Sequence, residues 1–119
     1  MSTREADSAD VLLLKSALRA LQWLGCADAD LIDRLGLNVQ EVDFGQERIP
    51  LSLQIRDAAI QLVQIYRSVY TLVGSDQPQG QTWMGSRNDS LRDMPANLLQ
   101  TQEGRGSLLS YLGRFHDMA

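Results

Sequence analysis

The hydrophobic pattern is strongest between Leu51 and Val73. Two neighbouring rows of apolar residues recur there in steps of three, four or seven, the spacing of one wide buried face on an α-helix. We therefore predict a central helix of roughly 23 residues, about 35 Å long at 1.5 Å per residue. Such a face can contact helices on two sides, or leave part of itself for a second copy of the chain. The first row comprises Leu51, Ile55, Ala58, Leu62, Ile65, Val69 and Leu72, and the second comprises Ala59, Tyr66 and Val73.

Shorter helical patterns precede this central helix. Apolar residues in steps of three and four predict a first helix over Asp10–Leu24, which ends at Gly25. The carboxylate of Asp28 can cap a second helix that ends at Gly36. A third short segment is predicted over Asn38–Phe44.

Start signals for helices recur after the central helix. Ser75 or Asp76 can cap a helix whose first turn holds Pro78, and Pro95 marks another helix start. Thr101 is a natural cap for a last helix. No stretch has the pattern of a strand, so the sequence predicts an all-α fold of six or seven helices. In the last helix Leu108, Leu109, Leu112 and Phe115 line one side.

The composition and the longest apolar run limit the class of protein to which this chain can belong. Hydrophobic residues make up 44% of the 119 residues and charged residues 22%, which is typical of a soluble globular protein. The longest apolar run, Val11–Leu14, is far shorter than the roughly 20 residues that cross a bilayer. The polar residues at the start of the chain are not followed by the apolar segment of a secretory signal, so we expect a cytoplasmic protein without membrane association.

Residues that could carry out catalysis are few and scattered. A single cysteine, Cys26, and a single histidine, His116, exclude an internal disulfide and a Cys/His zinc site. Asp30 and Asp33 lie one helical turn apart on a face that we expect to be exposed, and no glycine-rich phosphate loop is present. We therefore expect no enzyme activity, no cofactor and no bound metal.

Residues 27–44 have the outline of a helix-turn-helix, with Gly36 at the turn. Between Leu24 and Glu47, however, one basic residue faces six acidic ones, a local net charge of −5 that a duplex would repel. Asn38 and Gln40 are the candidates for reading bases, with Arg48 and Arg56 beyond the motif as candidate contacts to phosphates. The charge thus disfavours DNA binding unless a dimer or a partner assists it.

The second half of the chain carries a recognisable series of residues. The series comprises Trp83, Asn88, Leu91, Pro95, Leu98, Leu99, Thr101, Glu103 and Gly104. In order and nearly in register, it resembles the toxin-binding domain of the Xre/MbcA/ParS antitoxins. Two departures stand out: Arg87 replaces a proline, and Arg92-Asp93 replaces a pair of glycines.

This resemblance implies three regions. Residues 1–50 would form an N-terminal helical region with a degenerate helix-turn-helix. Residues 51–74 would form the central helix, a possible dimer seam. Residues 75–119 would form a C-terminal toxin-binding domain.

The implied function is that of an antitoxin in a bacterial type II toxin–antitoxin pair. Its partner would be a RES-domain toxin that acts on NAD, and the antitoxin would inhibit it by covering the active-site cleft. The candidate contact residues, by resemblance, are Trp83, Arg87, Asn88, Leu91, Arg92, Pro95, Glu103, Arg105, Arg114, Phe115 and His116. The apolar members of the motif can equally be core, and Asn88, Pro95 and Thr101 can be turn and cap residues.

Two other functions stay open at this stage. One is a helix-turn-helix repressor of its own operon, and the other is a localisation or scaffold protein like those of the ParS branch. A homodimer is also expected, with the central helix as its possible seam.

Overall fold

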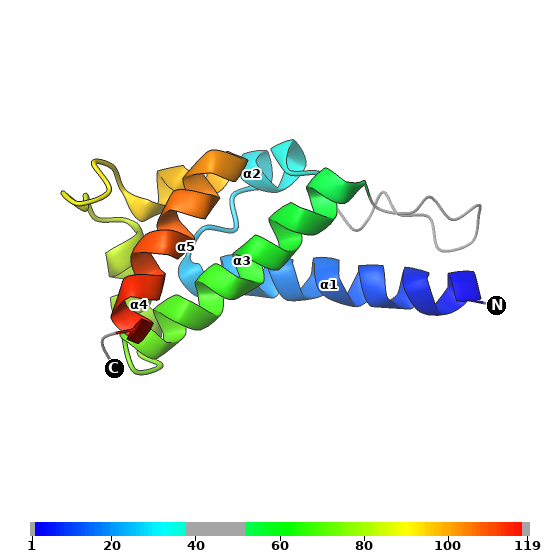
Figure 1. The fold of residues 1–119 in the computed structure, drawn as a ribbon, viewed down its shortest axis with the longest axis horizontal. Helices are drawn as coiled ribbons and strands as arrows, with labels where there is room; N and C mark the ends of the chain where they lie inside the picture. The colour runs from blue at the N-terminus through cyan, green and yellow to red at the C-terminus, as the bar shows by residue number, and fades with distance from the viewer. Residues whose placement is uncertain (1, 38–51, 118–119) are drawn as a thin grey trace.

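The computed structural model describes the backbone of residues 2–37 and 52–117, and the side-chain environments of residues 9–37 and 52–115. Over these residues the chain forms six helices and no strand, which confirms the all-α prediction (Figure 1). The helices are α1 Ser2–Leu24, α2 Ala29–Arg34, α3 Leu53–Leu72, α4 Gln77–Met84, the 3₁₀ helix η2 Pro95–Gln100, and α5 Gln102–Asp117.

Two predicted caps are observed: the side chains of Asp28 and Asp76 accept hydrogen bonds from backbone N–H groups in the first turns of α2 and α4. Ser52, which was not predicted as a cap, does the same for α3, so this helix begins at Leu53 rather than at Leu51. The start of the first helix is also wrong: α1 begins at Ser2 rather than at Asp10, because a polar first turn leaves no apolar period to detect. The predicted segment Asn38–Phe44 lies outside the described residues.

α1 and α3 lie side by side and run in the same direction (Figure 1). Near their beginnings Arg56 Nη2 lies 3.1 Å from Asp10 Oδ1. Near their ends the ring of Trp23 lies 5.4 Å from that of Tyr66 and 5.5 Å from that of Tyr70. These contacts at both ends show that the two helices stay adjacent along their shared length.

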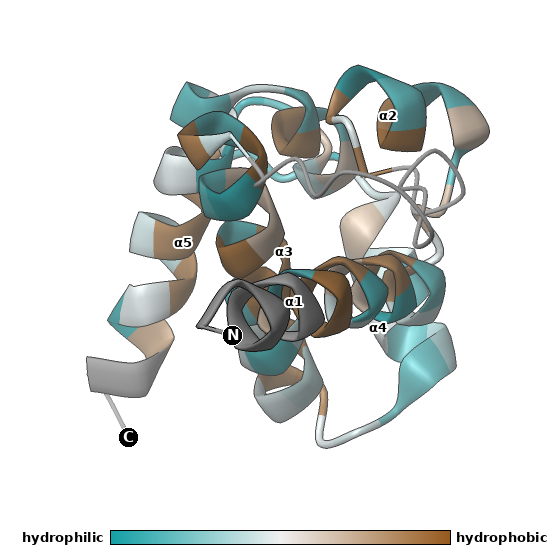
Figure 2. Cartoon of the chain, turned by 90° about the vertical axis from the view of Figure 1, so that its right-hand side faces the viewer, coloured by the Kyte–Doolittle hydropathy of each residue, from teal (hydrophilic) through white to brown (hydrophobic). Residues whose placement is uncertain are grey.

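α3 also packs against α5, so it is the middle helix of the fold. Its row of small and branched residues is fully enclosed, and the buried cluster continues from α1 through α3 to α4, η2 and α5. In Figure 2 hydrophobic and hydrophilic residues alternate along these helices, as amphipathic helices require. One predicted core residue is wrong: Leu72 is 37% exposed because it is the last residue of α3. The buried residues of α3 are Ala58, Ala59, Leu62, Ile65 and Val69.

The beginning of α5 packs tightly on η2. Thr101 Oγ1 accepts a hydrogen bond from Gly104 N at 2.9 Å, which caps α5 as predicted. A Cβ atom at Gly104 would lie 2.4 Å from the carbonyl oxygen of Leu98, a distance that real Cβ atoms do not reach. Glycine is therefore required where α5 meets η2. None of the helices described here is both long and apolar enough to span a membrane.

Gly104→Ala should lower the free energy of unfolding by about 1–3 kcal/mol, because the new methyl group overlaps backbone that cannot move aside freely. The matched control is Gly106→Ala in the same helix, where a Cβ would meet nothing within 4 Å. This control should be neutral or stabilising by about 0.5–1 kcal/mol, since alanine favours a helix interior over glycine. Urea unfolding of both variants checks the prediction, and equal stabilities would contradict it.

Candidate functional site

The residues that resemble the antitoxin motif fold into one unit made of α4, the turn after it, η2 and α5. Asn88 organises the turn: its Oδ1 accepts hydrogen bonds from Ser90 N at 3.0 Å and Leu91 N at 3.2 Å. Its own N–H donates to the carbonyl of Asp93 at 3.0 Å, which closes the loop. Asn88 thus stabilises the turn, which is the structural role that the sequence offered beside that of a contact residue.

Arg92 has a φ of +61°, in the left-handed region that favours glycine. It stands where the resembling antitoxins have a glycine pair, so the local backbone keeps the conformation that a glycine would adopt. Its N–H donates to the Asp89 carbonyl at 3.3 Å. The side chain of Arg92 is exposed.

Asp93 joins the turn to the start of η2. Its Oδ1 accepts hydrogen bonds from Met94 N at 2.7 Å and from Asn97 Nδ2 at 2.8 Å. The bond from Asn97, then the bond from Met94 and the positive charge of Arg87, hold the pKa of Asp93 below its ordinary value of 3.8. The carboxylate therefore acts as a fixed acceptor near neutral pH.

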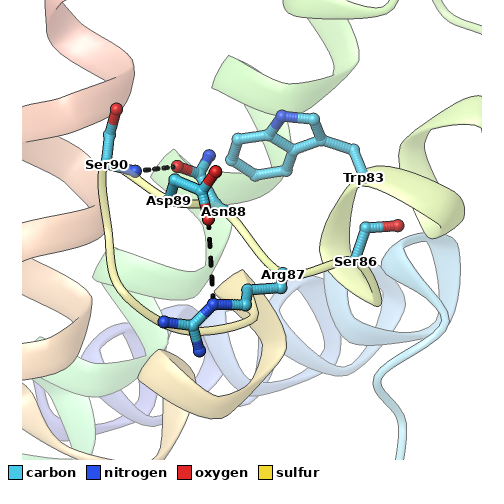
Figure 3. A pocket seen from close by; sticks show the side chains of 6 residues that line it. All are labelled: Trp83, Ser86, Arg87, Asn88, Asp89 and Ser90. Carbon is cyan, nitrogen blue, oxygen red and sulfur yellow. Dashed lines mark hydrogen bonds and ion pairs between the residues drawn. The ribbon is translucent and has the colours of Figure 1, made fainter.

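A shallow pocket of about 230 Å³ lies on this turn. Figure 3 shows the indole ring of Trp83 on one side of it and the guanidinium of Arg87 on the other. Arg87 Nε lies 3.8 Å from Asp89 Oδ1, and both side chains are exposed, so the pair is weak and can exchange partners. The pocket is lined by Trp83, Ser86, Arg87, Asn88, Asp89 and Ser90.

Three aromatic side chains, here named the aromatic row, continue from this pocket along α5. Trp83 stacks on Tyr111 with ring centroids 6.4 Å apart and an interplanar angle of 21°. Tyr111 meets Phe115 edge to face, with centroids 5.1 Å apart. Phe115 is 40% exposed, so part of its ring is available for a contact. The aromatic row thus extends from the loop after α4 to the last described residues of α5.

The other predicted contact residues divide into three groups. Arg114 and Glu103 are exposed, as a surface contact requires, whereas Pro95 is buried and Leu91 is half-buried. The prediction for Arg105 needs correction, because this residue is only 5% exposed and its guanidinium bonds to Gln61 and Leu99 inside the protein. The side chain of His116 and all of Asn38, Gln40 and Arg48 lie outside the described residues.

Sequence reasoning missed Tyr111. The signal was its position four residues before Phe115 in the predicted last helix, since residues at that spacing lie on one face. It was overlooked because the leucines define the buried side of that helix, and Tyr111 lies beside them.

The described residues hold few groups with reactive chemistry. Burial raises the pKa of the Cys26 thiol to about 11, and its Sγ lies 3.5 Å from the Leu24 carbonyl, so it is a poor nucleophile at neutral pH. No three residues of the types that bind metals come together in the parts of the chain described above. The absence of enzyme activity and of a cofactor stays a prediction.

Arg92→Gly should leave the free energy of unfolding unchanged or raise it by up to about 1 kcal/mol, because the left-handed backbone no longer opposes a Cβ atom. Arg92→Val, a β-branched residue at the same position, should lower it by about 1–2 kcal/mol. Thermal or urea unfolding measures both. A valine variant as stable as the glycine variant would show that this turn does not need its positive φ.

Asn97→Ala should raise the pKa of Asp93 toward 3.8, because it removes the largest cause of the lowered value. A lowered pKa in the folded state stabilises the protein above the ordinary value, and this contribution is lost as the pH falls through the folded pKa. The variant should therefore lose less stability on acidification than the wild type. Carbon-13 NMR titration of the Asp93 carboxyl group measures the shift, and Gln100→Ala, outside this network, should leave it unchanged.

Comparison with models of known protein families found no match, and comparison with curated proteins found none either. The resemblance to the antitoxins therefore rests on the motif residues of the sequence alone.

Proposed function

We propose that this protein is a cytoplasmic antitoxin that binds a RES-domain toxin acting on NAD and covers its active-site cleft. The contact surface would be the aromatic row together with Arg87, Arg92 and Arg114 around it. In this proposal the antitoxin makes and breaks no covalent bond, and inhibition follows from exclusion of NAD.

One observation carries the proposal. The residues that resemble the antitoxin motif assemble into a single unit, in which polar members fix the turn and apolar members join the core. Pro95 and Leu99 are fully enclosed, and Thr101 caps α5. Nearly every residue of the motif thus has a role in folding. The aromatic row lies next to these residues and provides a surface for a partner.

The chemistry of this surface suits a protein partner. An exposed phenylalanine beside two half-buried aromatic rings, with arginines nearby, has the composition of the residues that dominate binding energy at protein interfaces. Phe115 and Tyr111 would fill an apolar depression, and the exposed carboxylate of Glu103 would pair with the basic groups that hold NAD phosphates.

The proposed homodimer would use the outer face of α3. Leu53 is 73% exposed and Ile60 is 39% exposed, and their spacing of seven residues places them on one side of the helix. Operon repression and scaffolding stay secondary proposals, because the helix expected to read DNA lies outside the described residues.

The test is co-expression with the RES-domain protein encoded beside this chain. The wild type should restore growth and co-purify with the toxin, whereas Phe115→Asp should weaken binding by at least tenfold, because it places a charge in an apolar contact. Isothermal titration calorimetry measures the loss. Sedimentation of the free protein reports the dimer.

Leu12→Asp is the matched control, since it makes the same kind of change at a residue of α1 that is 64% exposed. It should leave toxin binding intact. Failure of the wild type to bind or rescue would remove the proposal, and equal losses from both variants would place the contact elsewhere.

A further inference from the structure

A second groove, of about 360 Å³, lies between the end of α2, the beginning of α3 and the beginning of α5. It is separate from the aromatic row, because Arg105 in the groove precedes Phe115 by ten residues, or about 15 Å along α5. Its volume is in the range of sites for small ligands. Residues that line it include Asp33, Arg34, Ser52, Ile55, Gln102 and Arg105.

The buried guanidinium of Arg105 is the unusual feature of this groove. Its Nε donates to Gln61 Oε1 at 2.8 Å and its Nη1 donates to the Leu99 carbonyl at 2.9 Å. Both acceptors are neutral, and among the described residues no carboxylate lies within ion-pair distance and no acceptor meets Nη2. An arginine that is 5% exposed therefore keeps its charge without a counter-ion from this part of the chain.

A buried positive charge is costly unless an anion pairs with it. Loss of hydration already lowers the pKa of Arg105, although a guanidinium remains charged at physiological pH. An anion in the groove would meet the remaining N–H groups on Nη2 and replace the water that burial has removed. The arrangement is thus prepared for a negatively charged ligand.

Two helix N-termini and Arg34 add further positive charge around the groove. α3 and α5 both begin at it, and the beginning of a helix carries partial positive charge. Arg34, at its rim, lies 3.2 Å from Asp30 Oδ2 in an exposed pair that an incoming anion can replace.

The lining also limits the kind of anion. Asp33 offsets one of the two arginines, so a singly charged group neutralises the groove, whereas a dianionic phosphate would leave an excess negative charge in it. Leu35, Ile55 and Ala58 provide an apolar wall beside the guanidinium. A single carboxylate attached to a small branched apolar group matches both the charge and the wall.

We propose that this groove binds a monocarboxylate with a short apolar body, and that the carboxylate pairs with the buried guanidinium of Arg105. Two sources share this chemistry: a free branched-chain carboxylic acid, and an acidic side chain of a partner protein. The site is independent of the proposed toxin contact.

Proton–nitrogen NMR of the full chain tests the proposal, with the Nε–H of Arg105 and the amides of Gln54 and Gln102 as reporters. Isobutyrate at constant ionic strength should shift these signals with saturation. Isobutyramide, its neutral counterpart, should not, and phosphate should bind at least threefold more weakly. A titration with N-acetyl-glutamate amide distinguishes the sources: whichever carboxylate binds more tightly identifies the one that the groove suits.

Variants complete the test. Arg34→Gln should weaken isobutyrate binding at least threefold and Arg105→Met at least tenfold, while Arg67→Gln, at an exposed arginine remote from the groove, should leave it unchanged. If Arg105→Met does not fold, Arg34→Gln and the comparison of isobutyrate with isobutyramide still test whether the groove binds a carboxylate. Equal shifts from isobutyrate and isobutyramide, or no saturable shift in the wild type, would overturn the proposal.

Discussion

The placement of α3 between α1 and α5 is the constraint on which the rest of the fold depends. Small residues, Ala58 and Ala59, lie where the neighbouring helices come close, and Leu62, Ile65 and Val69 fill the remaining space without exposure. No other helix contacts both α1 and α5 as extensively, so removal of this middle element would separate the two halves of the core.

A polar contact fixes α5 against this middle helix. Gln61 of α3 accepts from Arg105 of α5, and the same guanidinium reaches the carbonyl of Leu99 in η2. Buried polar groups of this kind stabilise a fold only when their partners are in place. The guanidinium of Arg105 therefore links α5 to both α3 and η2, and its two hydrogen bonds help to fix how these three helices pack together.

The sequence predicted those parts of the fold that depend on local chemistry. Caps at Asp28, Asp76 and Thr101, and the apolar row of α3, follow from hydrogen bonding and helical period alone, and the structure has these three caps and the part of the row from Ala58 to Val69. The burial of Arg105 was not predictable, because it depends on Gln61, which lies 44 residues away in the chain. The exposure of Leu72 likewise depends on where other helices end.

The candidate site was predicted only in part, because it too depends on contacts between residues that are distant in the chain. The motif order located the turn and Trp83, but the partner of that ring, Tyr111, is set by the packing of α5 on η2. Gly104 permits this packing, since any larger residue would push the start of α5 away from Leu98. α5 transmits such a shift over the eleven residues from Gly104 to Phe115, about 16 Å. The exposed end of the aromatic row is therefore positioned by a close contact at the opposite, buried end of the same helix.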